Sequence, residues 1–98
     1  MLSETRFAES FARSRVERGQ GPVRIRRDLR RHGVSAEQVE LALEAMAVDW
    51  FARATEVRER RFGEAPPADL RARSKQCRFL EYRGFTAEQI RAATGADD

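Results

Sequence analysis

Apolar residues recur every three or four positions along nearly the whole chain, a spacing that is typical of amphipathic α-helices. Between Pro22 and His32, for example, Ile25 and Leu29 lie one helical turn apart, and His32 falls on the same side. No stretch alternates apolar and polar residues in the manner of a β-strand. The pattern therefore predicts an all-α chain.

Glycine, proline and short polar side chains divide this pattern into six helices. Gly33 and Gly84 can take the left-handed conformation that ends a helix, and Pro22 suits a first helical turn. Asp49 can cap the segment that ends at Gly63, whereas the adjacent prolines of GEAPPAD mark a loop. The expected helices span about residues 3–18, 22–32, 35–46, 49–63, 69–83 and 86–93.

Two of these boundaries have the same pattern. GVSAEQV at residues 33–39 and GFTAEQI at residues 84–90 lie 51 positions apart. Ser35 and Thr86 can each cap the next helix, and the glutamine three residues later can complete a capping box. The flanking apolar residues can form hydrophobic staples, Val34 with Val39 and Phe85 with Ile90. A repeat of this length is typical of tandem architectural units.

We therefore expect tandem three-helix repeats in an elongated helical array, curved to the right or to the left. In this sequence of helices we expect one complete three-helix repeat at residues 21–63. Residues 1–20 would then be the last helix of an incomplete first repeat, and residues 64–98 the first two helices of a third. The apolar side of an incomplete first repeat would allow chains to associate with one another.

Composition narrows the function classes. The chain has 98 residues, of which 41% are apolar and 36% charged, so it cannot enclose a large catalytic cavity. Its net charge is +3, with 18 arginines and the single lysine Lys75. A high-GC genome would also enrich arginine, so only the placement of the arginines can indicate a role. Cys77 is the only cysteine, and charges interrupt the first ten residues, which favours a cytoplasmic protein without a signal peptide or membrane span.

The arginines form a repeated stripe. Opposite the apolar side of the helix at 22–32, basic residues follow one another at spacings of three and four, and the positions 51 residues later hold Lys75, Arg78 and Tyr82. Stacked like charges repel by about a few tenths of a kcal/mol per pair, so the stripe favours an anionic partner, although a solvated charged face is the alternative. The candidate contact residues are Arg24, Arg27, Arg31, Arg71, Lys75 and Arg78.

Base readout by a helix-turn-helix is disfavoured by charge. Residues 34–52 hold Glu37, Glu40, Glu44 and Asp49 and no basic residue, so the second helix of the corner would be repelled by phosphates. The basic surfaces suit a phosphate backbone or an acidic protein groove.

No residue set supports catalysis, a metal site or a cofactor site. The chain lacks a glycine-rich phosphate loop, a Ser-His-Asp set and a plausible pair of carboxylates, and His32 is its only histidine. The aromatic residues fit the core better than a site. We expect Trp50 and Phe51 to pack with Ala54 and Val57, and Phe79 to pack beside Leu80. A non-enzymatic role is therefore expected.

Several long strings resemble, in this order and spacing, the RecX family of bacterial regulatory proteins. They are LSETRFAESFARSRVERGQGPVRIRRDLRRHGV, DWFARATEVRERRFGE and KQCRFLEYRGFTAEQI, which together cover nearly the whole chain. The most specific pieces are GxGPxRIRxxL, from Gly19 to Leu29, and RFLxxRGF, from Arg78 to Phe85. Compared with the family, the chain begins where the final helix of the first repeat is expected.

The resemblance implies tandem three-helix repeats that bind the RecA recombinase and regulate it, mainly by inhibition. Such a protein would lie in the groove of the RecA filament on single-stranded DNA and would limit filament growth, ATP hydrolysis, strand exchange and co-protease activity. These activities belong to recombinational repair and the SOS response. Whether the DNA is contacted directly stays open. The alternatives are a sequence-independent nucleic-acid-binding module that acts without RecA, and a helical scaffold whose charges only keep it soluble.

Overall fold

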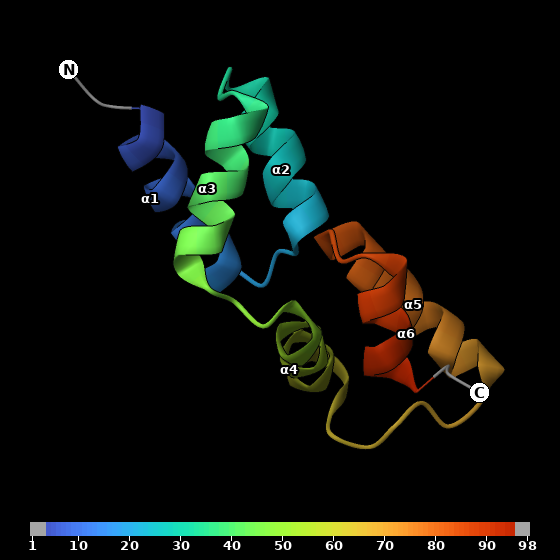
Figure 1. The fold of residues 1–98 in the computed structure, drawn as a ribbon. Helices are drawn as coiled ribbons and strands as arrows, with labels where there is room; N and C mark the ends of the chain where they lie inside the picture. The colour runs from blue at the N-terminus through green and yellow to red at the C-terminus, as the bar shows by residue number, and fades with distance from the viewer. Residues whose placement is uncertain (1–3, 96–98) are drawn as a thin grey trace.

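The computed structural model describes residues 4–95. Within them the chain forms six α-helices and no β-strand (Figure 1), which confirms the predicted fold class. Every predicted helix is found within about two residues of its expected ends, although the predicted start at residue 3 lies outside the described residues. The helices are α1 (Glu4–Glu17), α2 (Pro22–Arg31), α3 (Ala36–Met46), α4 (Trp50–Phe62), α5 (Leu70–Arg83) and α6 (Ala87–Thr94).

The repeated corners are confirmed, with one difference between the copies. Before α6, Thr86 accepts a hydrogen bond from the backbone N–H of Gln89, and the Gln89 side chain accepts one from the Thr86 N–H, so the capping box is complete. Before α3, Ser35 accepts from the Gln38 N–H. The Gln38 side chain does not return this bond, because its Oε1 accepts a 2.6 Å hydrogen bond from Thr5 of α1.

The helices pack as two three-helix units, α1–α3 and α4–α6. The first unit encloses one cluster of buried apolar residues: Ala8, Ala12, Ile25, Leu29, Val34, Val39, Ala42 and Leu43. The second unit encloses another: Ala54, Val57, Leu80, Phe85, Ile90 and Ala93. The half-buried Trp50 packs against both clusters and so links the units.

This grouping differs from the predicted division at residues 1–20, 21–63 and 64–98. The predicted boundary after residue 63 falls in the GEAPPAD loop, but that loop connects α4 to α5 inside the second unit. The units are instead joined by the three residues 47–49, in which Ala47 has the left-handed φ of 50°. In addition, α1 is a full member of its unit, because Ala8 and Ala12 are completely buried. The apolar side of α1, which would allow chains to associate if it were exposed, is thus packed within its own unit.

Most of the expected core residues are buried. Ile25, Leu29, Ala54 and Leu80 have no exposed surface. Phe51 is an exception, since 48% of it is exposed. In this turn of α4 it is Trp50 that contacts the core.

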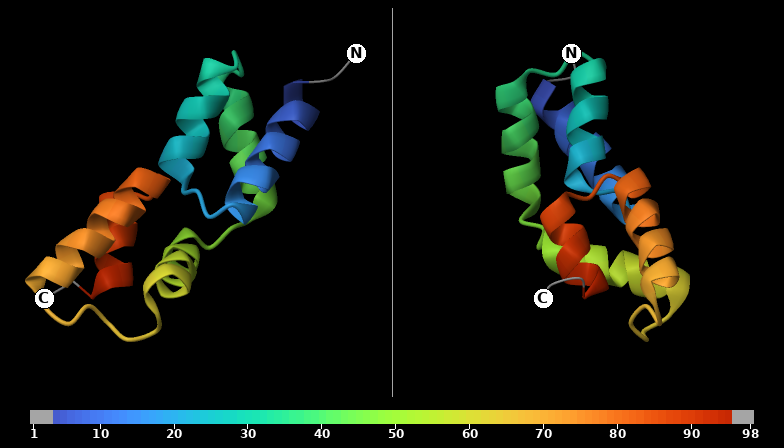
Figure 2. Two further views of the ribbon diagram at one scale, coloured as in Figure 1. Left: turned by 180° about the vertical axis from the view of Figure 1, so that it is seen from behind. Right: turned by 90° about the vertical axis from the view of Figure 1, so that its right-hand side faces the viewer.

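The two units lie one after the other, which gives the molecule an elongated shape of 52 × 19 × 18 Å. Figure 2 shows the same arrangement from behind and from the side, with the N-terminal unit at one end and the C-terminal unit at the other. The elongated form that the sequence predicted is confirmed.

Candidate interaction surface

The C-terminal end of α5 meets the N-terminal end of α2, although the two helices belong to different units (Figure 1). The backbone N–H of Gly21 donates to the carbonyl oxygen of Arg83, and the N–H of Val23 donates to that of Gly84, both at 2.8 Å. First-turn N–H groups and last-turn carbonyls have no partner within their own helices. The unpaired carbonyl groups at the end of α5 therefore accept hydrogen bonds from the unpaired N–H groups at the start of α2.

Glycine permits this close approach of two backbones. A Cβ atom on Gly21 would lie 2.5 Å from the carbonyl oxygen of Gly84 and 2.7 Å from the nitrogen of Phe85. A Cβ atom on Gly84, whose φ is +100°, would collide with the Cβ of Arg24. Gly21 and Gly84 are thus required where the two units meet. The sequence predicted helix ends at these glycines but not the contact between them.

Side chains strengthen this contact between the C-terminal end of α5 and the N-terminal end of α2, which we call the joint. Nη1 of Arg24 donates to the carbonyl oxygen of Tyr82 at 3.3 Å, and its guanidinium lies 5.3 Å from the centre of the Tyr82 ring. Nη1 of Arg83 donates to the carbonyl oxygen of Arg18 at 2.7 Å. These contacts hold α5 and α2 end to end, so that their solvent-facing sides follow one another along the molecule.

The solvent-facing sides of α5 and α2 carry what we call the basic ridge: Arg71, Lys75 and Arg78 on α5, and Arg27 and Arg31 on α2. All five residues are exposed. At 1.5 Å per residue, α5 and α2 are about 21 Å and about 15 Å long, so the ridge follows much of the long axis. On α5, its three cations line a surface depression of about 470 Å³ together with Asp69 and Ala72.

Arg24 is the predicted contact residue that the structure places differently. Only 25% of its side chain is exposed, and it is held by the joint and lies 4.0 Å from Asp28. Its neighbours on the stripe were correctly expected to project outward. The two halves of the stripe, which the sequence related only by a 51-residue repeat, become neighbours in space at the joint.

The helices differ strongly in formal charge. Five basic residues and one acidic residue give α2 a charge of +4, and the same count gives α5 a charge of +4. Three glutamates and no basic residue give α3 a charge of −3. Like charges along α2 are partly compensated by Asp28, which is 16% exposed and lies 3.2 Å from Arg15 and 3.5 Å from Arg27. The net positive charge of the ridge therefore faces solvent.

Two kinds of residue were not identified from the sequence. Tyr82 was noted only as the repeat equivalent of Arg31, yet it is 73% exposed at the joint end of α5. Arg53 and Arg83 connect the units through the backbone of the first unit, since Arg53 Nη2 donates to the carbonyl oxygen of Val16 at 2.8 Å. Their partners are 37 and 65 residues away, a distance at which helical periodicity carries no signal.

Among residues 4–95, no group of three or more His, Cys, Asp or Glu side chains could hold a metal ion. His32 instead stacks edge-on against Phe7 and Phe11, with ring centres 5.6 Å and 5.2 Å away. No helix in the same range is long and apolar enough to cross a membrane.

Comparison with known proteins agrees with the two-unit architecture. The family model described as RecX, second three-helix domain, matches residues 3–43, and that of the third three-helix domain matches residues 47–94. The whole chain is 57% identical to the Regulatory protein RecX of Halorhodospira halophila, of which it covers 61%. It is 45% identical over 99% of its length to that of Pseudomonas entomophila, covering 63%, and 48% identical over 95% to that of Chromohalobacter salexigens, covering 60%. The chain thus spans about three-fifths of these relatives.

Proposed function

Because the chain belongs to the RecX family of regulatory proteins, we propose that it regulates the RecA recombinase, mainly by inhibition. It would lie in the groove of the RecA filament on single-stranded DNA and limit filament growth, ATP hydrolysis, strand exchange and co-protease activity. Its setting would be recombinational repair and the SOS response in the cytoplasm. It would act by binding, without catalysis of its own.

The continuous basic ridge carries this proposal. A helical filament presents a groove that is long and narrow, and the molecule is 52 Å long but only 19 Å and 18 Å across. Along it, the joint aligns two helices of charge +4. A fixed row of cations is attracted by acidic protein surfaces and by phosphates, both of which occur in a nucleoprotein groove.

The test is the DNA-dependent ATPase of RecA, measured together with strand exchange, with and without the protein. We expect inhibition by the wild-type chain and weaker inhibition by the double variant Arg71→Gln/Arg78→Gln, which removes two exposed ridge charges. The matched control is Arg13→Gln/Arg91→Gln, because it removes two exposed arginines from α1 and α6 without touching the ridge. Helicity measured by circular dichroism establishes that all variants are folded.

Two outcomes would contradict the proposal. Unchanged ATPase and strand exchange in excess wild-type protein would remove RecA as the target. Equal loss of inhibition in the ridge variant and in the control would leave RecA as the target but would show that the effect depends on overall charge and not on the ridge.

A second candidate function, sequence-independent binding of single-stranded nucleic acid without RecA, is favoured by Tyr82. This ring is 73% exposed beside the ridge and is supported from one side by Arg24. Aromatic rings within basic grooves stack with bases of any sequence. If all five ridge cations contacted phosphates, the logarithm of the binding constant would fall with the logarithm of salt concentration with a slope of about −3.5.

Fluorescence anisotropy with a labelled oligothymidylate at several salt concentrations measures this slope. Tyr82→Ala should weaken binding without changing the slope, because it removes stacking and no charge. Absence of binding at low salt, or a slope near zero, would eliminate this candidate and leave the RecA proposal as it stands.

A further inference from the structure

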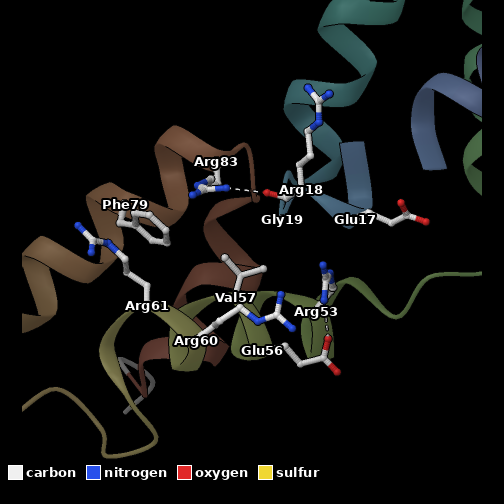
Figure 3. A pocket seen from close by; sticks show the side chains of 10 residues that line it. All are labelled: Glu17, Arg18, Gly19, Arg53, Glu56, Val57, Arg60, Arg61, Phe79 and Arg83. Carbon is white, nitrogen blue, oxygen red and sulfur yellow. Dashed lines mark hydrogen bonds and ion pairs between the residues drawn. The ribbon is translucent and has the colours of Figure 1, made fainter. Parts of the chain in front are cut away.

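A second cationic feature lies between the two units, apart from the ridge. It is a pocket of about 190 Å³ enclosed by the end of α1, by α4 and by α5 (Figure 3). Its lining includes five arginines, Arg18, Arg53, Arg60, Arg61 and Arg83, and two glutamates, which leaves a formal charge of +3.

Two of the five arginines are held in place by the protein itself. Arg53 donates to the carbonyl oxygen of Val16 and pairs with Glu56 at 3.0 Å, which also neutralises that glutamate. Arg83 donates to the carbonyl oxygen of Arg18, as Figure 3 shows. Arg83 therefore brings positive charge to the pocket from a fixed position, while Arg53 offsets the charge of Glu56.

The other three arginines differ from these two in their side-chain contacts. Within the described residues, Arg18, Arg60 and Arg61 make no hydrogen bond or ion pair through their side chains. Arg61 only lies over the rings of Phe62 and Phe79, 5.7 Å from each centre. Figure 3 shows the Arg18 side chain pointing away from the other side chains of the pocket, so the unpaired guanidinium groups at the pocket are those of Arg60 and Arg61. These groups repel one another and the Arg83 guanidinium, so an anion that binds among them is attracted by each of them.

The shape of the pocket limits the anion. Its volume is below the roughly 300–1,000 Å³ of sites for drug-sized ligands, which suits a small group. Arg61 and Arg83 both lie over the ring of Phe79, at 5.7 Å and 4.9 Å, so a base that stacked on this ring would compete with these guanidinium groups. The guanidinium donors come from two helices, α4 and α5. A planar carboxylate needs only one arginine for a bidentate pair, whereas the several oxygens of a phosphate can accept from donors on both helices.

We propose that this pocket is a binding site for a phosphate group, held by Arg60 and Arg61 with Arg53 and Arg83 as fixed supports. The phosphate belongs either to the backbone of a nucleic acid or to a small free phosphate. Because Gly19 lines the pocket from the first unit and α4 and α5 line it from the second, the bound phosphate lies between the units. This inference does not depend on RecA as the target.

The experiment is a titration of the wild-type chain with inorganic phosphate, followed by NMR at constant ionic strength. We expect saturable shifts of the backbone amides of Gly19, Val57 and Phe79, which line the pocket. Arg60→Gln/Arg61→Gln should weaken binding about tenfold or more, since it removes charge-assisted hydrogen bonds. The control Arg13→Gln/Arg91→Gln should leave the affinity unchanged, and both variants replace exposed side chains and should keep the fold.

A second arm separates the sources of the phosphate. If a ten-nucleotide oligothymidylate shifts the same amides and competes with inorganic phosphate, the source is the nucleic-acid backbone; if phosphate alone saturates them, it is a free phosphate. Shifts that rise linearly, or that are equal in the wild type and in Arg60→Gln/Arg61→Gln, would overturn the site. Saturation by hexaglutamate but not by phosphate would also overturn it, in favour of an acidic protein segment. RecA is absent throughout, so a failure to inhibit RecA would not affect this result.

Discussion

The close backbone contact at the joint between α5 and α2 predicts that Gly21→Ala destabilises the protein. Gly21 has φ −92° and ψ 175°, an extended conformation that alanine adopts without strain. Without the joint, this substitution would stabilise the protein by about 0.4–1 kcal/mol, because it restricts the unfolded chain. With the joint, the new Cβ meets backbone atoms of Gly84 and Phe85 at 2.5–2.7 Å, and backbone cannot rotate away as a side chain can. The ends of the helices must therefore separate.

The cost follows from what the joint contains. Separation breaks the two backbone hydrogen bonds donated by Gly21 and Val23, each with a net contribution of about 0.5–1.5 kcal/mol. It also disturbs the Arg24 and Arg83 hydrogen bonds, which are partly exposed and contribute less. Offset by the gain in the unfolded state, the expected loss is about 2 kcal/mol.

Urea denaturation measures the loss of stability, and hydrogen exchange of the Val23 amide measures the joint itself. A loss of about 2 kcal/mol in local stability corresponds to exchange that is roughly 30-fold faster. The control is Gly33→Ala, at the repeat equivalent of Gly84. Gly33 has φ +88° but no atom within 4 Å of its Cβ position, so its substitution costs about 1–2 kcal/mol through backbone strain alone and leaves Val23 protected.

Gly21→Ala that is as stable as the wild type, with Val23 still protected, would refute this account of the joint. Equal destabilisation by both glycine variants would not decide the matter without the exchange data, since strain and collision can have similar costs. The Val23 amide separates the two causes.

Three further predictions concern the interior of the units, and urea denaturation checks each of them. Asp28→Asn should destabilise the protein by about 1–2 kcal/mol, because three arginines share the half-buried carboxylate. The control Glu40→Gln breaks an exposed ion pair and should cost under about 0.5 kcal/mol. Equal losses of stability in the two variants would contradict this prediction. Leu80→Ala should cost about 2–5 kcal/mol, because this side chain is completely buried, and Leu70→Ala, with 74% exposure, should cost almost nothing. Arg58→Ala should cost about 2–3 kcal/mol and make residues 63–69 sensitive to protease, because buried Arg58 donates a hydrogen bond to a carbonyl oxygen of that loop. Unchanged protease resistance of the loop would show that Arg58 does not hold it in place.

The six helices could be predicted because their signals are local. Gly84 ends a helix at φ +100°, and Thr86 and Asp49 accept the capping bonds that their positions suggested. A cap needs only residues within one turn, all of which the sequence displays side by side. The buried side of α2, with Ile25 and Leu29, followed from periodicity for the same reason.

The grouping of the helices could not be predicted in the same way. The sequence predicts a boundary after residue 63, but which three helices share a core depends on contacts between residues far apart in sequence. For the same reason, periodicity predicts the exposure of only some of the basic residues in the stripe. Arg27 and Arg78 are exposed as expected, whereas Arg24 is held at the joint by a carbonyl 58 residues away.

The joint also has a consequence for the proposed binding surface. A partner that contacts both halves of the ridge must find Arg71 and Arg78 of one unit and Arg27 of the other at fixed separations. If the units moved freely, binding would have to restrict that motion at a cost in entropy, which a preformed joint removes. Gly21→Ala leaves every ridge charge in place and changes only their alignment. On the RecA proposal it should therefore weaken inhibition although Gly21 carries no side chain, and inhibition that survives an opened joint would mean that one half of the ridge is sufficient.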